Sequence, residues 1–127
     1  MAIDPTEQSL AAFAADAAED AGPIVMINLL KYDGVDGAAS YQQYADAVAP
    51  HLTSVGATVL YAGDVSRRVI GDEGAVEWDA VLAVQYPSRR AFLTMIENPE
   101  YQAIHHYRAE ALETSELIAT APWFPIS

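Results

Sequence analysis

The seven residues Ile24-Val25-Met26-Ile27-Asn28-Leu29-Leu30 decide the fold, because they form a short apolar run with turn signals on both sides. Gly22-Pro23 precedes the run, and Asp33-Gly34 follows it closely. A run of this length that is apolar at successive positions is typical of a central strand covered on both faces. We therefore expect residues 24–30 to form a strand in the middle of a sheet.

The segments around this strand predict an α+β domain. We expect a first helix from an Asp4 cap to about residue 21, and a second from a Ser40 cap to Gly56 with Pro50 inside it. A hairpin should follow, with strands 58–70 and 78–86 and a bulge or close approach at Gly63. Helical segments over 88–97 and 98–113 and a last strand over 117–121 complete the prediction. After the first helix the order is βαββαβ, the ferredoxin-like arrangement. The predicted parts are an N-terminal helix (1–22), the ferredoxin-like α+β domain (23–122) and an apolar C-terminal tail (123–127).

One face of such a sheet lacks a cover, because both helices of a βαββαβ unit lie on the same side. The strands at 24–30 and 80–84 are apolar on both faces. A bare outer face would be an apolar patch of several hundred Å², which is larger than monomers usually expose. We therefore expect a homodimer with the two sheets face to face, a dimeric α+β barrel. The alternative is that the N-terminal helix alone covers this face.

The composition excludes several classes of function. The chain has 127 residues, with 6 Lys and Arg against 18 Asp and Glu, so its net charge is −12. This balance argues against nucleic acid or an anionic membrane as a partner. The absence of cysteine excludes disulfides, thiolate zinc sites and cysteine nucleophiles. With neither a signal-peptide pattern nor an apolar run long enough for a bilayer, we expect a cytoplasmic protein.

Several motifs in a fixed order resemble a known family. They are VMINLLKY (25–32), YQQYA (41–45) followed by VAP (48–50), WDAV (78–81), YPS (86–88) with AF (91–92), NPEY (98–101) and LIAT (117–120). Over residues 22–122 the chain resembles the domain-of-unknown-function 1330 family, within the dimeric α+β barrel superfamily. The resemblance implies the fold and a homodimer but no activity. The superfamily also contains cofactor-independent monooxygenases, muconolactone-type isomerases, haem enzymes and ligand-sensing domains, which offer analogy only.

Asn28 is the polar exception in the central strand and the best single candidate for a binding residue. Its alternation partners are Met26 and Leu30, so its amide points into an apolar layer with four hydrogen-bonding positions to satisfy. It could orient a carbonyl or hydroxyl group of a ligand. The alternative is that it bonds a neighbouring side chain or backbone group.

The histidine pattern predicts no metal site. His105 and His106 are adjacent on a helix and diverge by about 100°, so they cannot bind one metal from the same face. His105 shares a face with Tyr101 and Arg108, and is the candidate for an inward-facing catalytic base. His51 follows Pro50 at the edge of an apolar stripe and is a candidate ligand-binding residue. We expect neither a metal nor another cofactor.

Asp79 is the second catalytic candidate, because it stands on a strand that is otherwise apolar. If it faces the interior, it is either paired or has a raised pKa, and the available partners are Arg67, Arg68 and Arg108. The alternative is an ordinary strand-end charge in water. Arg67 is also a candidate for recognising an anion. Tyr61 and Tyr101 are amphipathic rings that could line an apolar pocket for an aromatic ligand.

Three functions remain open from the sequence. The first is a cofactor-independent enzyme of the monooxygenase or isomerase type, with a pocket for a small apolar or aromatic molecule between sheet and helices. The second is a non-catalytic ligand-binding or sensing domain that uses the same pocket. The third is a dimerisation module without a ligand. The chain carries no G-x-S-x-G, phosphate-binding or dinucleotide-binding motif, which disfavours acyl transfer, phosphoryl transfer and dinucleotide-dependent redox chemistry.

Overall fold

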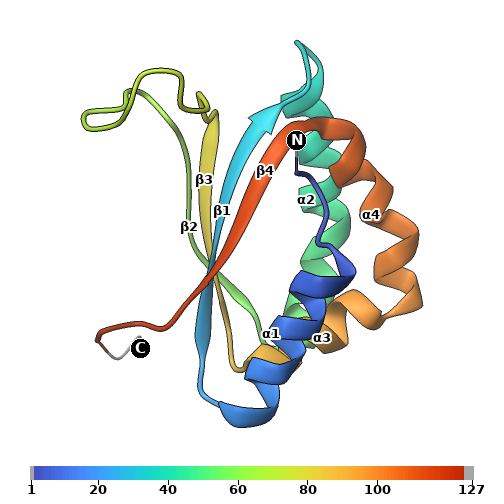
Figure 1. Cartoon of the computed structure of the whole chain (residues 1–127). Helices are drawn as coiled ribbons and strands as arrows, with labels where there is room; N and C mark the ends of the chain where they lie inside the picture. The colour runs from blue at the N-terminus through green and yellow to red at the C-terminus, as the bar shows by residue number, and fades with distance from the viewer. Residues whose placement is uncertain (1, 125–127) are drawn as a thin grey trace.

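The computed structural model describes residues 2–124, which form the expected α+β domain (Figure 1). The elements are α1 (Glu7–Glu19), β1 (Ile24–Tyr32), α2 (Gly37–Ser54), β2 (Thr58–Asp64), β3 (Ala80–Tyr86), α3 (Arg89–Glu97), α4 (Pro99–Ala111) and β4 (Leu112–Thr120). The four strands form one antiparallel sheet in the order β2-β3-β1-β4. This is the ferredoxin-like βαββαβ topology, and it confirms the prediction from the sequence.

All four helices lie on one side of the sheet (Figure 1). α1 packs against α3, where the rings of Phe13 and Phe92 meet edge to face at 5.4 Å. The alternative in which the N-terminal helix covers the outer sheet face is therefore wrong, because α1 lies with the other helices and its Phe13 ring packs against α3.

Strand alternation divides the central strand between two environments. Ile24, Met26 and Leu30 face the helices and are buried in the core. Ile27 and Leu29 point to the opposite side, where they are only half-buried. We call that side the outer face. By register it also carries apolar side chains from the neighbouring strands, namely Val81, Ala83 and Ile118.

The first helix begins later than predicted. Its N-cap is Thr6, whose hydroxyl accepts from the Ser9 N–H at 3.0 Å while the Ser9 hydroxyl accepts from the Thr6 N–H at 3.0 Å. The predicted Asp4 cap is wrong, because the Asp4 carboxylate contacts His105 on α4 instead, at 2.6 Å. The helix ends at Glu19 rather than residue 21, since Asp20 is extended.

The second helix begins earlier than predicted, at Gly37 rather than Ser40. A Cβ atom at Gly37 would lie 2.7 Å from the Cβ of Tyr32 and 2.8 Å from the carbonyl oxygen of Ala111, so the start of α2 depends on glycine for its close approach to the sheet. The helix continues through Pro50 to Ser54, and Gly56, with φ +77°, follows it as expected.

The hairpin differs from the predicted one. β2 ends at Asp64, not at residue 70, and residues 65–79 form a loop closed at its base by the Val65 N–H donating to the Asp79 carbonyl at 2.9 Å. The register shift lies between Val59 and Tyr61 rather than at Gly63. The close approach expected at Gly63 is confirmed, because the Tyr61 ring occupies the space that a Cβ there would need.

The last strand begins directly after α4, at Leu112 rather than residue 117. The polar run Glu113-Thr114-Ser115-Glu116 concealed its start in the sequence. Thr114 and Ser115 are nevertheless buried, because the backbone of the N-terminal segment satisfies them: the Thr114 hydroxyl and the Ser115 N–H both donate to the carbonyl of Ala2, at 2.8 and 2.7 Å.

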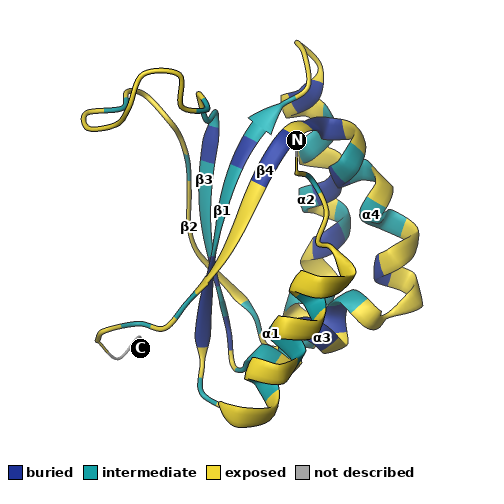
Figure 2. Ribbon diagram, in the orientation of Figure 1, coloured by how far each residue is buried: buried dark blue, intermediate teal, exposed yellow. Residues whose placement is uncertain are grey.

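The 65–79 loop and the C-terminal arm are both largely exposed (Figure 2). Trp123 is 94% exposed and Phe124 is 76% exposed, and in the 65–79 loop Val69 and Ile70 are also exposed. The predicted apolar tail continues through residues 125–127, which lie outside the described residues. Within residues 2–124, no helix has both the length and the apolar character needed to cross a bilayer.

Candidate functional site

A cavity of about 160 Å³ lies between the sheet and α2. The side chains around it are mostly aliphatic or aromatic. They are Asn28, Tyr41, Tyr44, Ala45, Val48, Ala49, Leu52, Val59, Leu82, Val84, Tyr86 and Met95. On α2 the lining includes two small residues, Ala45 and Ala49.

Asn28 reaches this cavity from the centre of the sheet, paired in register with Leu82 on β3 and Leu117 on β4. Its side chain is half-buried and makes no hydrogen bond to any residue between 2 and 124. An amide among apolar neighbours keeps its donors and acceptor available for whatever enters the cavity. This is the position expected from strand alternation.

Three tyrosines also line the cavity: Tyr41, Tyr44 and Tyr86. Burial raises the pKa of Tyr44 and of Tyr86 well above the usual tyrosine range, and it raises the pKa of Tyr41 to about 12. These hydroxyls are therefore neutral at physiological pH and serve as hydrogen-bonding groups rather than as anions.

Tyr44 begins a chain of polar contacts that leads from the cavity to the surface. Its hydroxyl lies 3.0 Å from the hydroxyl of Tyr101, which lies 3.4 Å from Nδ1 of His105. Nε2 of His105 is 2.6 Å from a carboxylate oxygen of Asp4. Tyr101 is buried, whereas about half of the Asp4 side chain is exposed. The ring of His51 meets Tyr101 edge-on at 6.2 Å.

Arg108 adds a buried positive charge beside this chain. Its side chain is buried, Nη1 donates to the Ile3 carbonyl at 2.8 Å, and Nη2 donates to the Ser115 hydroxyl at 3.3 Å. Among residues 2–124 it has no carboxylate within ion-pair distance. Burial raises the pKa of Tyr101, and the Arg108 charge opposes this effect. Arg108 therefore fixes the N-terminal segment that carries Asp4 and makes the surroundings of the tyrosines more positive.

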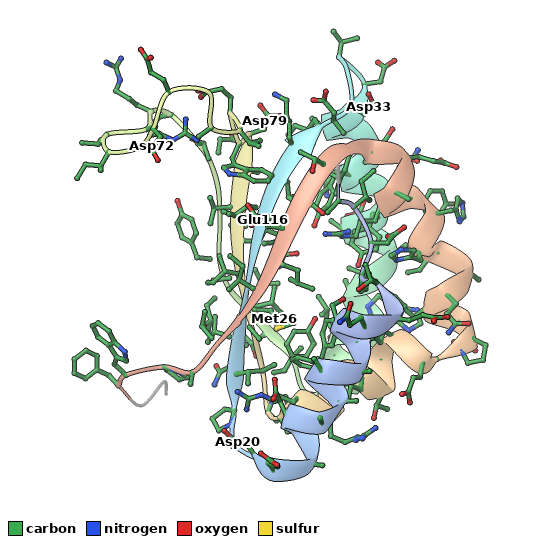
Figure 3. All side chains as sticks on the ribbon, in the orientation of Figure 1. Asp20, Met26, Asp33, Asp72, Asp79 and Glu116 are labelled. Carbon is green, nitrogen blue, oxygen red and sulfur yellow. The ribbon has the colours of Figure 1, made fainter. Side chains whose placement is uncertain are left out.

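The other predicted site residues lie away from the cavity. The Asp79 carboxylate accepts from the Tyr32 N–H at 2.8 Å at the far end of the sheet, near Asp33 (Figure 3). Tyr61 is 60% exposed and lies opposite Ala83 on the outer face. Arg67 is exposed in the 65–79 loop.

The sequence indicated part of this arrangement and missed the rest. It placed Tyr101, His105 and Arg108 on one helix face, and the structure brings all three to the same region. It assigned Asp4 to a helix cap, and the contact between Asp4 and His105 spans 101 positions of the chain. No local spacing could reveal a contact of that range. Within residues 2–124, no three His, Asp or Glu side chains are grouped so as to hold a metal ion.

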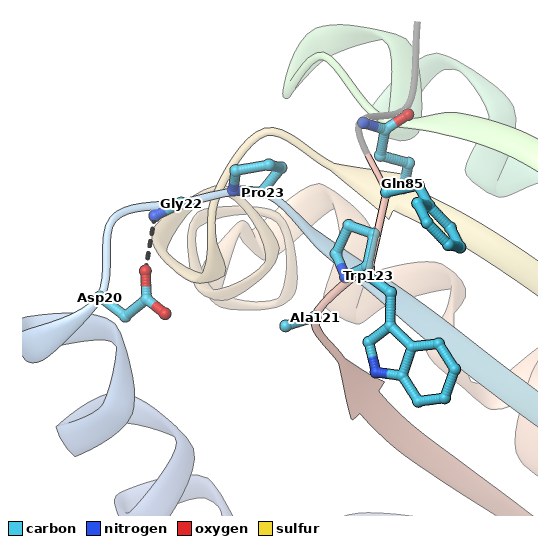
Figure 4. A pocket seen from close by; sticks show the side chains of 8 residues that line it. Asp20, Gly22, Pro23, Gln85, Ala121 and Trp123 are labelled. Atoms are coloured by element: carbon cyan, nitrogen blue, oxygen red, sulfur yellow. Dashed lines mark hydrogen bonds between the residues drawn. The ribbon is translucent and has the colours of Figure 1, made fainter.

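A larger, open groove of about 370 Å³ lies where the α1–β1 connection meets the C-terminal arm (Figure 4). Its lining includes Gln85 and the exposed Trp123. Its one carboxylate, Asp20, already accepts from the Gly22 N–H at 2.8 Å and pairs with Arg89 at 3.1 Å. Because that carboxylate already has partners, the smaller cavity beside Asn28 is the stronger candidate site.

Solved structures similar to this chain share its fold. A protein of unknown function from Rhodopseudomonas palustris is 34% identical, with a TM-score of 0.87, and the match covers 98% of each chain. Two further structures, each 14% identical with a TM-score of 0.54, come from Bacteroides fragilis and Thermobifida fusca. The matches cover 78% and 81% of this chain and 95% and 93% of those chains. Both are described as dimeric proteins of unknown function with a ferredoxin-like fold.

No curated protein matches the chain. Residues 29–121 match the model of a family described as domain of unknown function DUF1330. That region runs from the last four residues of β1 through α2, β2, β3, α3 and α4 to the end of β4. The chain belongs to the DUF1330 family.

Proposed function

We propose that the protein binds a small, mainly apolar molecule in the cavity beside Asn28. The observation that carries the proposal is the Asn28 amide, which has no partner in the described chain and faces an apolar cavity. Small-molecule sites typically combine apolar walls with a few well-placed polar groups. An apolar cavity of about 150 Å³ is large enough for benzene, so the volume beside Asn28 suits a ligand with one ring or a short chain.

The groups around the cavity can support proton movement without a cofactor. Asn28 is suited to orient a carbonyl or hydroxyl group, and Tyr44 connects the cavity to His105 through Tyr101. Of the cofactor-independent enzyme types, an isomerase needs only such proton movement. Binding without catalysis uses the same cavity and remains the alternative. We leave Asp79 out of the proposed site because its carboxylate accepts a hydrogen bond from the Tyr32 N–H at the end of β1, away from the cavity.

The test of ligand binding is mass spectrometry of small molecules that remain bound to purified protein, followed by NMR titration with phenol as a defined probe. Asn28→Ala removes the amide, and Gln85→Ala serves as a matched control because Gln85 lines the other groove. We expect wild type and Gln85→Ala to retain the molecule and Asn28→Ala to lose it. If Asn28→Ala retained as much of the bound molecule as wild type does, Asn28 would not be part of the binding site.

We further propose that the functional form is a homodimer in which a second copy covers the outer face. On that face Ile118 is 44% exposed, and Ile27 and Leu29 are half-buried. The 65–79 loop and the arm ending at Phe124 both project to the same side of the sheet (Figure 1). Related structures described as dimeric support this assembly.

Light scattering of the purified protein tests the dimer. At micromolar concentration we expect twice the chain mass of 13.7 kDa. Ile118→Lys places a charge on the outer face and should give the monomer, whereas Gln102→Lys, on the exposed side of α4, should leave the mass unchanged. A wild-type protein with the mass of one chain would contradict the proposed assembly.

A further inference from the structure

One carboxylate stands among the apolar residues of the outer face. Glu116 is the middle residue of β4 and pairs in register with Leu29, so its exposed side chain lies on the same side of the sheet as Leu29. The same row of the sheet continues through Val81 to Gly63, neither of which carries a charge. A second copy that buries this carboxylate must supply a cation, because an unpaired buried charge is costly.

The described part of its own chain supplies no cation to Glu116. Within residues 2–124, no Lys, Arg or His side chain lies within ion-pair distance of this carboxylate. Lys31 follows Leu29 by two positions on β1, but its ammonium group lies 3.9 Å from Glu113 and 3.4 Å from the Glu77 carbonyl. The partner that Glu116 lacks must therefore be sought on the second copy.

Arg67 is the basic residue that can act as this partner. The chain has six Lys and Arg residues. Among residues 2–124, four of them have partners: Lys31 with Glu113, Arg68 with Glu77, Arg89 with Asp20, and Arg108 with the Ile3 carbonyl. A fifth, Arg90, is exposed on α3, on the helix side of the sheet (Figure 1). Arg67 is exposed in the 65–79 loop, which projects to the outer side, and no carboxylate of the described chain lies within ion-pair distance of it.

The loop carries Arg67 far enough to reach a second sheet. Arg67 follows Asp64, the last residue of β2, by three positions. Three extended residues span about 10 Å, which is the usual spacing of two packed sheets. Asp64 also lies in the row next to the one that ends at Glu116, so the loop and Glu116 belong to the same end of the sheet.

The direction of the two-fold axis decides whether these charges meet. β2 and β4 are the two edges of the sheet. If the axis runs parallel to the strands, the β2 edge of one copy lies opposite the β4 edge of the other, with both loops at the same end. If the axis runs across the strands, β4 faces β4, and two Glu116 carboxylates of like charge share that contact. Only the parallel axis places Arg67 opposite Glu116.

We propose that Arg67 of each copy pairs with Glu116 of the other, and that these two ion pairs fix the axis of the homodimer parallel to the strands. The inference rests on the proposed function, because it assumes that a second copy covers the outer face. It adds the orientation of that copy and the charged residues that select it.

Two charge reversals test the pairing. Arg67→Glu and Glu116→Arg each place like charges at both contacts of a homodimer, which should raise its dissociation constant about 100-fold or more. An equimolar mixture of the two variants restores opposite charges at both contacts, since each chain then meets the complementary change on the other. We expect the mixture to form a heterodimer with a dissociation constant within about tenfold of wild type.

Controls separate this pairing from a general effect of charge. Arg90→Glu on α3 and Glu110→Arg on α4 make the same changes in net charge at exposed positions on the helix side, so both should dimerise as wild type does. The double variant Arg67→Glu/Glu116→Arg should also dimerise, and it keeps the test valid if a single variant fails to fold. Circular dichroism verifies folding, light scattering gives the mass, and native mass spectrometry distinguishes heterodimers from homodimers.

Each outcome bears on one of the two proposals. Dissociation of both single variants with recovery in the mixture supports the inference. Single variants that dimerise as wild type does overturn it, and so does dissociation without recovery in the mixture or in the double variant; in each case the wild-type homodimer still stands. If wild type has the mass of one chain, the proposed homodimer fails and the inference fails with it.

Discussion

Raising the pH above 10 should unfold this protein cooperatively, because its core contains several tyrosines whose hydroxyls are kept from water. Burial raises the pKa of each member of this group, which comprises Tyr41, Tyr44, Tyr86 and Tyr101. In the unfolded chain a tyrosine loses its proton near pH 10, whereas in the folded protein these four retain theirs. The folded state then binds more protons than the unfolded state, so stability falls as pH rises. Below pH 10 both states are protonated and the effect vanishes.

The magnitude follows from proton linkage. Each such tyrosine lowers the free energy of unfolding by about 1.4 kcal/mol per pH unit above 10, until its own folded pKa is reached. Tyr41, Tyr44 and Tyr86 together lower it by about 4 kcal/mol at pH 11, and Tyr101 adds a further decrease. A loss of this size is a large part of the stability of many small domains. We therefore expect unfolding near pH 11 to 12, at or below the pKa of about 12 for Tyr41.

The assay follows tyrosinate absorbance at 295 nm and far-UV circular dichroism through the same alkaline titration. The absorbance rise of the buried tyrosines should coincide with the loss of dichroism. Tyr86→Phe should reduce the pH dependence of stability by about 1.4 kcal/mol per pH unit, whereas Tyr61→Phe is the control at an exposed hydroxyl. Ionisation of all seven tyrosines with the dichroism intact would refute the reasoning.

Three further changes should lower stability by separate mechanisms, the first two measured by urea denaturation and the third by thermal denaturation. Gly37→Ala places a methyl group against Tyr32 and the Ala111 carbonyl and should cost about 1–3 kcal/mol; an unchanged midpoint would mean that the start of α2 can move away freely. Thr6→Ala removes one half of the capping box of α1 and should cost about 1 kcal/mol, while the exposed Thr94→Ala in α3 serves as the comparison. Deletion of residues 122–127 should lower the melting temperature if the apolar arm packs on a partner subunit, and an unaltered melting curve would argue that it does not.

The fold was predictable because its signals are local. The apolar run of β1, the Asn98-Pro99 start of α4 and the turn at Gly56 each depend on neighbouring residues, and each lies where the sequence indicated. The predicted ends of helices and strands were wrong where contacts with a distant segment determine the structure. Polar residues 113–116 pair as a strand because β1 is their neighbour and the carbonyl of Ala2 satisfies Thr114 and Ser115.

The part of the candidate site that depends on local spacing was also predictable from the sequence. The alternation of side chains along β1 predicts that Asn28 faces the helices, and helical spacing predicts that Tyr101 and His105 share one face of α4. The role of Tyr44 depends on the packing of α2 against α4, which brings together residues 57 positions apart. Asp79 lies just before β3, and its carboxylate accepts from the N–H of Tyr32, a residue 47 positions away, so no local pattern could reveal this contact.

The N-terminal segment links the stability of the fold to the chemistry of the cavity. It lies outside residues 29–121, which match the family model, yet the carbonyl groups of Ala2 and Ile3 satisfy β4 and Arg108. Those bonds hold the N-terminal segment in place, where Asp4 contacts His105 on α4. The family core therefore supplies the cavity and its tyrosines, while a segment before that core forms the surface end of the contacts that run from Tyr44 through Tyr101 to His105.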